Sequence, residues 1–595
     1  MINNLRIMAP YFKKIRLYLS LGPIFKLTEA IIELFLPLLM ARMIDEGVGA
    51  GNKEAIKHYG IWMLILVVVA VLFSFSCQYM ASLASQGFGT EVRNGVFHRI
   101  LSLSTEQLDA FGTGSLTNRL TVDINQMQVG VAMTIRLLSR APFLCIGGIL
   151  LALSINWKLS LVLLATVPLV VILLRFVMIA TVKIYHVVQN RLDKVAQLIQ
   201  DNLSGVRVIR AFDRGDRERN FFQEKNFSWQ AAIEKAGKVA ALINPVSVLI
   251  FNFGVVAVLY LGGQAIQVGT LTQGELIALI NYFNQIVMAL IVVANLALTF
   301  TRSFTALDRV VELFKIPNDN HAANSIIGHD SEMREKANQL LSEQPATELV
   351  FEHMSYTYPQ GSEPALNDIH FRLKPGESLG IIGGTGSGKS TLARLISGYA
   401  EPTEGRITWG GQDVSTLQSQ TGHRFVQLIF QKALLFSGTV RSNLVMVDPD
   451  ATEEDMWEVL EIAQADSFVR THLLGLDQPV ERGGLNFSGG QRQRLAIARG
   501  LLVNPHYLIM DDCSSGLDYA TDAALYKALE QWKDPHLSLI IISQRVYSVV
   551  RADRILVLDN GRMVGLGSHE ELLETCKLYQ EIYATQQEEV DDETA

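Results

Sequence analysis

Long apolar runs dominate the first half of the chain, up to about residue 305. Each run approaches the ~20 residues that a helix needs to cross about 30 Å of hydrocarbon. Because runs of this length do not fit a soluble bundle, they predict an all-α membrane domain over residues 1–310. Its six expected spanning helices are residues 17–44, 60–86, 133–155, 158–184, 239–267 and 275–303.

Two long polar connections separate these spans, at about residues 87–130 and 185–238. Both are patterned as helices and carry many Lys and Arg residues. Cationic residues beside a span tend to stay in the cytoplasm, so we expect both connections and both termini on the cytoplasmic side. The expected location is a plasma or bacterial inner membrane, with the lipid bilayer as a partner of the chain.

Some polar side chains fall inside the expected spans. Burying a charge in hydrocarbon costs a few kcal/mol or more, so such residues should face a neighbouring helix or a water-filled cavity. This pattern favours a solute pathway over a passive anchor, although a helix–helix contact is the more common role for any single residue. The residues are Glu29, Glu33, Arg42, Arg136, Arg140, Arg175, Asn252, Asn284, Gln285 and Asn295.

The pattern changes after about residue 310. Residues 311–348 are polar and predict a linker. Short β-rich runs then alternate with helical patterns over residues 349–583, which predicts an α/β domain with cytoplasmic placement. The last stretch, residues 584–595, is an acidic tail.

Composition narrows the classes of partner. The chain has 595 residues and a formal net charge of -8, and its basic residues form no cluster typical of nucleic-acid binding. Nucleic acid is therefore not an expected partner. The four cysteines are scattered without a CxxC pair, so they indicate neither a zinc site nor a disulfide framework.

A glycine-rich loop carries the strongest chemical signal. The segment GIIGGTGSGKST fits G-x-x-x-x-G-K-[ST] between an apolar strand and a helical pattern. Glycines allow backbone amides to surround phosphate, the lysine reaches the outer phosphates, and the serine hydroxyl can ligate Mg²⁺. This predicts a P-loop NTPase that binds nucleotide phosphates and Mg²⁺ through Gly383, Gly384, Thr385, Gly386, Ser387, Gly388, Lys389, Ser390 and Thr391.

A second signal is the hydrophobic strand HYLIMDD, about 120 residues farther on. An aspartate at such a strand end, here Asp511, can hold hydrated Mg²⁺ opposite the phosphate loop. The next position, Asp512, is where a carboxylate can orient the attacking water. Ser390 and Asp511 are therefore expected metal ligands.

The segment LNFSGGQRQRLAIARGLL resembles the signature motif of ATP-binding cassette (ABC) proteins. At its centre lie Ser488, Gly489, Gly490 and Gln491, which the resemblance implies are nucleotide-binding residues. Phosphate loop, signature and acidic strand follow the order of that family. By the same resemblance, Tyr358 stacks on adenine, Gln431 senses Mg²⁺ as a metal ligand and catalytic position, and residues 515–518 form the D-loop.

The membrane half resembles the exporter branch of the family, in which two half-transporters dimerise and swap helices. Residues 111–127 and 203–218 resemble the two intracellular loops whose short coupling helices dock on the cassettes. The alternative is a pair of plain solvated amphipathic helices. The resemblance covers nearly the whole chain and is weakest at residues 1–15, 316–348 and the acidic tail.

Two residues depart from the family pattern. The position after Asp511 is usually Glu, and here it is Asp512; the usual H-loop His is replaced by Gln544. A shorter carboxylate is misplaced by over ~1 Å, and an amide cannot relay a proton as imidazole can. With these two changes the chain resembles the degenerate-site subunit of heterodimeric bacterial multidrug exporters. The alternative is that Asp512 and Gln544 are tolerated sequence drift in a homodimer, in which hydrolysis is merely slowed.

The expected function is therefore ATP-driven efflux of lipophilic or amphipathic compounds by a heterodimer with a second half-transporter. By the resemblance, this chain's own site would bind ATP and hydrolyse it slowly, and its signature would complete the partner's active site. Alternatives are a homodimeric exporter of lipid or peptide, an ATP-gated channel or regulatory membrane protein, and a soluble cassette protein of nucleic-acid repair, which the six runs disfavour.

Overall fold

The computed structural model describes residues 2–316, 348–358, 361–420, 424–513, 516–532 and 537–594. The chain divides into two compact units. Residues Met1–His98 and Gly114–Ile316 form the first, and Arg99–Thr113 and Pro317–Ala595 form the second. Residues 317–347, most of the expected linker, lie outside the described residues.

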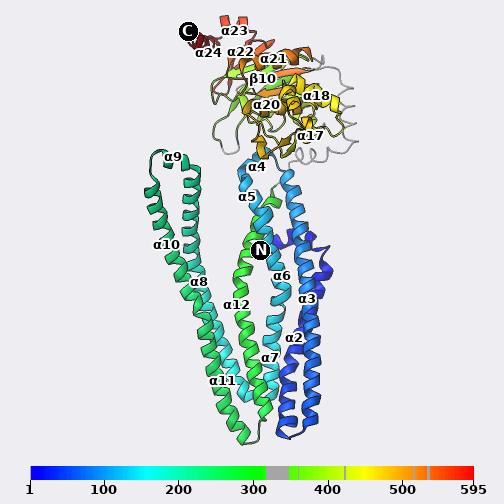
Figure 1. The fold of residues 1–595 in the computed structure, drawn as a ribbon, viewed down its shortest axis with the longest axis vertical. Coiled ribbons are helices and arrows are strands. Elements are labelled where there is room, and N and C mark those ends of the chain that lie inside the picture. Colours follow the sequence, from blue (N-terminus) through cyan, green and yellow to red (C-terminus); the bar gives the residue numbers. More distant parts are fainter. Residues whose placement is uncertain are drawn as a thin grey trace. The chain divides into compact units, whose positions relative to one another are not determined.

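The first unit is helical (Figure 1). Its long helices are broken by π-helical turns at Met43–Gly49, Arg119–Asp123 and Thr134–Leu138. Its other elements are α1 (Ile2–Met8), η1 (Ala9–Phe12), α2 (Arg16–Arg42), α3 (Lys53–Leu101, whose end enters the second unit), α5 (Thr113–Asn118), α6 (Ile124–Met133), α7 (Arg140–Ile155), α8 (Trp157–Ser204), α9 (Val206–Ala211), α10 (Gly215–Ala241), α11 (Ile243–Gln267) and α12 (Gln273–Lys315).

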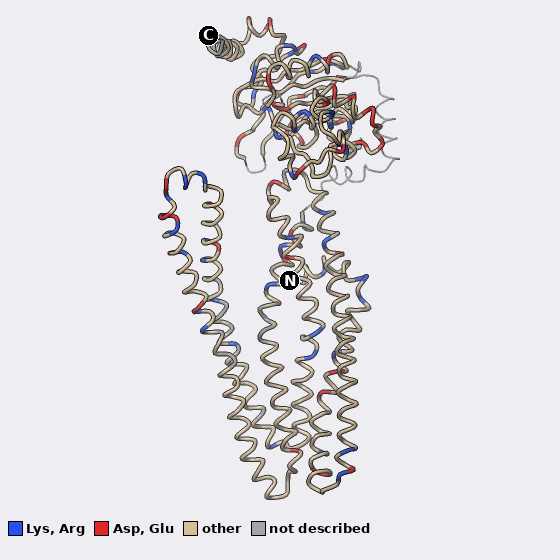
Figure 2. The backbone as a smooth tube through the Cα atoms, in the orientation of Figure 1, with Lys and Arg blue, Asp and Glu red and all other residues tan. Residues whose placement is uncertain are grey.

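Five stretches of the described chain are long and apolar enough to cross a membrane: Lys53–Leu101, Thr113–Ile155, Trp157–Val177, Pro245–Gln267 and Gln273–Val293. Few Lys, Arg, Asp or Glu residues lie along the halves of these helices that are farther from α9, which Figure 1 labels and Figure 2 shows in the same orientation.

The remaining expected span is α2, which carries the charged residues Lys26, Glu29 and Glu33. Two of these charges pair within the helix, because Lys26 Nζ lies 2.7 Å from a Glu29 carboxylate oxygen. Glu33 accepts a hydrogen bond of 2.7 Å from Arg140 on α7. Pairing reduces the cost of placing charge among apolar helices, so the 27-residue helix α2 can carry these three charges.

Helix α12 is the centre of the first unit and packs against α2, α6, α7, α8 and α11. Tyr282 and Phe283 are buried in its core, and the Tyr282 hydroxyl donates to the backbone oxygen of Leu34 at 2.7 Å. Gly254 on α11 faces Phe283, and a Cβ there would lie 2.4 Å from the ring. A glycine is therefore needed for this close helix–helix approach.

Helices α8 and α10 run side by side and are joined by α9 at their tip (Figure 1). The charges of the second polar connection lie on this arm, on both sides of α9 (Figure 2). Arg191 on α8 donates to the backbone oxygen of Ser228 on α10. Val188, Ala232 and Ala236 form a small buried seam between the two helices.

The second unit includes the short helix α4 (Thr105–Phe111), although α4 lies between α3 and α5 in chain order. Ser104 caps this helix, because its hydroxyl accepts from the Gln107 amide at 3.3 Å and the Gln107 side chain accepts from the Ser104 amide at 3.2 Å. The helix ends at Gly112, whose positive φ of 72° favours glycine.

The rest of the second unit is an α/β fold with a six-stranded sheet in the order β12-β11-β3-β10-β9-β6. Strands β11, β3, β10, β9 and β6 run parallel, and β12 is antiparallel to β11. Every residue of β3, β9 and β10 is buried, as expected for parallel strands covered on both faces. The bounds are β3 (Leu379–Gly383), β6 (Val426–Ile429), β9 (Tyr507–Asp511), β10 (Ser538–Ile542), β11 (Arg554–Asp559) and β12 (Arg562–Gly567).

A four-stranded antiparallel sheet in the order β2-β1-β4-β5 and a short β7–β8 pair complete the strands. These are β1 (Leu349–Tyr356), β2 (Leu366–Leu373), β4 (Glu404–Trp409), β5 (Gln412–Asp413), β7 (Gly438–Thr439) and β8 (Pro479–Val480). The helices are α15 (Lys389–Ile396), α16 (Val414–Gln420), α17 (Val440–Val445), α18 (Glu453–Ile462), α19 (Asp466–Thr471), η5 (Gly475–Asp477), η6 (Arg482–Gly484), α20 (Gly489–Leu501), α21 (Tyr519–Gln531), α22 (Val546–Val549), α23 (His569–Thr575) and α24 (Lys577–Thr594), which includes most of the expected acidic tail.

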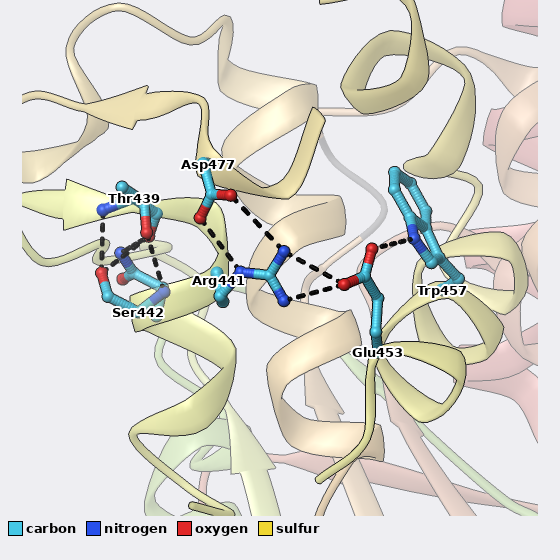
Figure 3. A network of polar contacts seen from close by, with 7 residues as sticks. Thr439, Arg441, Ser442, Glu453, Trp457 and Asp477 are labelled. Atoms are coloured by element: carbon cyan, nitrogen blue, oxygen red, sulfur yellow. Dashed lines mark hydrogen bonds and ion pairs between the residues drawn. The ribbon is translucent and has the colours of Figure 1, made fainter. Parts of the chain in front are cut away.

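One arginine joins three elements of the helical part of this unit (Figure 3). Arg441 on α17 donates to Asp477 of η5 at 3.0 Å and to Glu453, at the start of α18, at 3.3 Å. Glu453 also accepts from the indole of Trp457 at 3.4 Å. Because α17 and α18 both pack on α20, this network fixes the helices that support the signature segment.

Candidate nucleotide-binding site

The phosphate loop connects β3 to α15, as the sequence predicts. Gly386 and Gly388 have left-handed backbone angles (φ 82° and 101°) that favour glycine. A Cβ at Gly388 would also lie 2.6 Å from the Leu366 side chain. The chain therefore turns tightly into α15, and the amides at the start of that helix provide the positive potential of a phosphate site.

Lys389 is buried and its ammonium group points back into the loop. Its Nζ donates to the carbonyl oxygens of Gly383 and Gly384, at 2.7 Å each. Burial lowers the pKa of Lys389, and the negative charges of Asp511 and Asp512 oppose that shift. The lysine thus lies where it can exchange carbonyl partners for phosphate oxygens.

Ser390 and Asp511 come together although 121 residues separate them, and the Ser390 hydroxyl donates to Asp511 Oδ1 at 3.3 Å. Burial raises the pKa of Asp511, while the bond from Ser390 and the charge of Lys389 oppose the shift. A hydroxyl and a carboxylate are oxygen ligands of the kind that Mg²⁺ takes, alongside water and phosphate oxygens. This pair fits the predicted metal position.

Asp512 follows β9 in a left-handed conformation (φ 51°), and its amide donates to the Ile542 carbonyl at 2.8 Å. Gln431 lies just after β6, and its side-chain amide donates to Asp512 Oδ2 at 2.9 Å. The structure therefore brings together Gln431 and Asp512, which the sequence predicts separately and never as a pair.

Gln544 follows β10 and is exposed. Gln586 of α24 holds the backbone around it, because Gln586 Nε2 donates to the Gln544 carbonyl at 2.7 Å and Gln586 Oε1 accepts from the Val546 amide at 2.8 Å. Sequence reasoning missed Gln586, since no motif marks a residue on the last helix as a neighbour of this loop.

Arg545 is a second residue that sequence reasoning missed. Its guanidinium donates to the Tyr547 hydroxyl at 2.7 Å. This bond is the main cause that raises the pKa of Arg545, and the charges of Asp512 and Asp522 add to it. The cationic Arg545 therefore lies near the Asp512 carboxylate. Its place in the sequence, directly after Gln544, could have marked Arg545 as a site residue.

Tyr358 follows β1, is 38% exposed, and packs edge-on against Tyr356 at a ring separation of 5.0 Å. Its hydroxyl shares a hydrogen bond of 2.9 Å with the Thr391 hydroxyl on α15. Two predicted nucleotide-binding residues are therefore in contact. The bond holds the ring beside the first turn of α15, where a base can stack on it.

The signature residues form the start of α20. Ser488 caps the helix in a reciprocal pair with Gln491: the Ser488 hydroxyl accepts from the Gln491 amide at 3.3 Å, and the Gln491 side chain accepts from the Ser488 amide at 2.9 Å. Gly489 has open space where a Cβ would lie, and Gly490 approaches the Gly516 carbonyl closely. Ser515 of the expected D-loop lies outside the described residues.

Comparison with known proteins identifies the family. Residues 19–290 match the model of the ABC transporter transmembrane region, and residues 366–515 match the ABC transporter model. An uncharacterized ABC transporter ATP-binding protein of Mycobacterium tuberculosis (strain CDC 1551 / Oshkosh) is 34% identical over 586 residues, which cover 98% of each protein. The chain belongs to the ABC transporter family.

This ABC transporter is also similar to the ATP-dependent lipid A-core flippase of Vibrio vulnificus (strain YJ016), with 27% identity over 577 residues and 96% of each protein. Its fold matches that of a bacterial Atm1-family ABC exporter solved with ATP bound, with a TM-score of 0.76 and 22% identity over 98% of this chain and 99% of the other. The predicted fold class, a helical transmembrane domain fused to an α/β nucleotide-binding domain, is confirmed.

Proposed function

We propose that this ABC transporter is one subunit of a heterodimeric exporter of lipophilic or amphipathic compounds, and that its own nucleotide site binds Mg·ATP but hydrolyses it slowly. One observation carries the proposal: two altered residues follow the neighbouring strands β9 and β10. After β9 comes a short carboxylate, Asp512, and after β10 a neutral amide, Gln544. Binding residues are intact at the same site, so the defect is confined to hydrolysis.

Nucleotide binding rests on four groups. Lys389 would bind the outer phosphates, Ser390 and Asp511 would hold Mg²⁺, and Tyr358 would stack on the base. The distances of 2.7 Å from Lys389 to the loop carbonyls, 3.3 Å from Ser390 to Asp511 and 2.9 Å from Tyr358 to Thr391 support this arrangement. Mg²⁺ would neutralise the phosphate charge that develops during cleavage.

Slow hydrolysis follows from the position of Asp512. Its carboxylate is one methylene shorter than that of Glu and already accepts from Gln431 at 2.9 Å. Misplacing a water-orienting group by about 1 Å can cost ~100-fold in rate. Gln544 adds a second loss, since an amide cannot exchange a proton as imidazole does.

Hydrolysis would then depend on the partner's site, which the signature of this chain would complete. The Ser488–Gln491 capping pair orders the first turn of α20, and Gly489 leaves the helix amides open toward an anion. The signature thus offers an ordered phosphate site at the start of a 13-residue helix.

The arm formed by α8, α9 and α10 supports a dimer that swaps helices. It carries large exposed apolar side chains. Contact with a second subunit would bury these side chains and remove them from water. These are Ile199, Leu203, Val206, Val208, Phe212, Phe221, Phe227 and Ile233. In this proposal residues 203–218, which contain α9, and residues 111–127, which contain α5 and begin at the end of α4, are the coupling segments that transmit cassette closure to the two membrane domains.

Two cavities in the membrane unit support an amphipathic substrate. One, of about 600 Å³, is lined almost wholly by apolar side chains, including Phe88, Met127 and Phe304. The other, of about 220 Å³, contains the Glu33–Arg140 pair with Asn284 and Gln285. The two cavities have adjacent lining residues, because Leu138 lines the first and Leu137 the second. An apolar tail would bind in the first cavity and a polar head in the second.

The test is the ATPase rate of the chain alone in lipid, beside the native heterodimer and an Asp512→Glu, Gln544→His double variant. We expect a nearly inactive lone chain, an active heterodimer and a restored variant. Lys389→Ala in the double variant is the control, because it should abolish the restored rate. A lone chain that dimerises and turns over as fast as the heterodimer would refute the degenerate site.

The lipid A-core flippase similarity favours a second candidate, a homodimeric exporter of lipid. Transport into inside-out vesicles separates the candidates: a lipid flipped by the chain alone supports the homodimer, and a lipophilic dye accumulated only with the partner supports the heterodimer. An ATP-gated channel would build no gradient of either solute.

A further inference from the structure

Three side chains with metal-binding atoms meet on the antiparallel sheet of the second unit. They are His353 on β1 and Asp368 and His370 on β2, and their ligand atoms all lie within 4.8 Å of one another. His353 Nδ1 lies 2.6 Å from Asp368 Oδ1, and His370 Nδ1 lies 3.7 Å from the same oxygen. The two imidazole rings are 5.1 Å apart and 30° from parallel.

A bulge in β1 turns His353 outward. Phe351 pairs with Phe371 and Met354 with Ile369, so two residues of β1 lie opposite the single residue His370 of β2. In a regular strand His353 would share the buried face of Phe351. The extra residue instead leaves the His353 side chain 77% exposed, beside His370.

A second bulge, in β2, brings the carboxylate to the same place. Between the pairs Met354–Ile369 and Tyr356–Leu366, two residues of β2 lie opposite Ser355 alone. Asp368 is one of them, and its amide donates to the Ser355 hydroxyl at 3.0 Å. His353 (φ 46°) and Asp368 (φ 54°) both adopt left-handed conformations, each of which costs ~1 kcal/mol or more for a side chain other than glycine.

We propose that His353, Asp368 and His370 bind a divalent transition-metal ion of the Zn²⁺ class. Two imidazole nitrogens and one carboxylate oxygen are a ligand set that Zn²⁺, Co²⁺, Ni²⁺ and Cu²⁺ prefer and that Mg²⁺ does not. Metal bonds of about 2.0–2.2 Å place ligand atoms ~3.4 Å apart in a tetrahedron. The present separations of 2.6 and 3.7 Å from Asp368 Oδ1 to the two imidazole nitrogens lie on either side of this spacing, and an ion would replace the hydrogen bond between His353 and Asp368.

Exposure of the three side chains leaves room for water at the remaining coordination position. The carboxylate of Asp368 is 60% exposed and the His370 side chain 52%, so the ion can enter without unfolding the sheet. The site is separate in chemistry from the Mg²⁺ position at Ser390 and Asp511, which offers only oxygen ligands. A bound ion would cross-link β1 and β2 five residues before Tyr358.

The experiment uses the full chain, without a polyhistidine tag, in lipid nanodiscs with Mg²⁺ in large excess. Zn²⁺ is titrated by calorimetry, and Co²⁺ is followed by its visible absorption. We expect the wild-type chain to bind one Zn²⁺ more than the His353→Asn, His370→Asn double variant binds. Each single variant should bind this Zn²⁺ at least ~10-fold more weakly than the wild type does. Asn suits the left-handed position 353 and removes the imidazole.

His472→Asn is the matched control, since His472 is an exposed histidine of the same unit outside the cluster. It should bind Zn²⁺ as the wild-type chain does. A Zn²⁺-dependent rise in the thermal midpoint, present in wild type and in His472→Asn and lost in the double variant, is the second readout. Equal stoichiometry and affinity in wild type and the double variant would overturn the proposal.

Discussion

The side-chain amide of Gln431 donates a 2.9 Å hydrogen bond to the carboxylate of Asp512, across 81 positions of sequence. This bond joins the segment after β6 to the end of β9. It occupies one oxygen of the carboxylate that would orient water. Lengthening or releasing that carboxylate should therefore change the rate of hydrolysis more than it changes nucleotide binding.

Asp512→Glu alone should raise the rate of ATP cleavage at this site by about tenfold or more, because the added methylene moves the carboxylate outward by ~1 Å. Single-turnover cleavage in the heterodimer, with the partner's site blocked, measures the rate. Nucleotide affinity should change by less than about threefold. An unchanged cleavage rate would show that Gln544, rather than Asp512, limits the site.

Asp522, on α21, should make stability depend on pH. It is buried, its Oδ1 has no hydrogen-bond partner among the described residues, and burial raises its pKa from 3.8 to about 6. Between these values the unfolded chain loses the proton that the folded chain keeps, so the Asp522 contribution to stability falls as pH rises. Asp522→Asn should therefore stabilise the chain by up to about 3 kcal/mol near neutral pH and by little near pH 4.

Thermal midpoints of wild type and Asp522→Asn at several pH values test this prediction. Asp518→Asn is the contrasting variant, because backbone and side-chain hydrogen bonds from Thr521 lower the pKa of Asp518. Its destabilising effect should be present at neutral pH and fade on acidification. A midpoint difference for Asp522→Asn that is the same at all pH values would show that folding does not raise the pKa of Asp522.

The Glu33–Arg140 pair should behave as a unit. Each side chain is 30% exposed, so removal of one partner leaves a partly desolvated charge. We expect Arg140→Leu or Glu33→Leu to lower the thermal midpoint in nanodiscs by a few degrees, and the exchange Glu33→Arg, Arg140→Glu to recover about half of the loss. Lys57→Leu, which breaks an exposed pair with Glu54, should change little.

Gln586→Ala should loosen the segment around Gln544. The variant removes two hydrogen bonds, of 2.7 and 2.8 Å, whose net contribution is about 1 kcal/mol each. Amide hydrogen exchange at Val546 should then accelerate about tenfold, while exchange in β9 stays constant. Gln587→Ala, the adjacent residue on α24, is the control. Equal protection of the Val546 amide in both variants would show that the two hydrogen bonds of Gln586 do not hold this segment.

The sequence predicted the features that depend on local pattern. The phosphate loop between strand and helix, the acidic end of β9 and the apolar spans each carry their signal within a short window. The three charges Lys26, Glu29 and Glu33, which lie close together in the helix, explain why α2 is the one expected span outside the five apolar stretches found among the described residues.

Features that depend on distant partners were not predicted. Gln586 reaches Gln544 through the packing of the last helix, and Glu33 meets Arg140 across 107 positions. The two bulges that gather His353, Asp368 and His370 arise from strand register, which alternation of apolar residues does not specify at a single position. Such contacts are set by tertiary packing rather than by local propensity.

The contact between Gln586 and the segment at Gln544 also concerns the order in which the protein is made. The phosphate loop, the signature and the acidic strand are all translated before α24, and domains tend to fold from the N-terminal side during synthesis. A nascent chain can therefore assemble every nucleotide-binding motif while this loop still lacks its backbone partner. Completion of the segment around Gln544 is therefore postponed until α24 has been synthesised, and a variant that lacks α24 would capture nucleotide with an untethered loop.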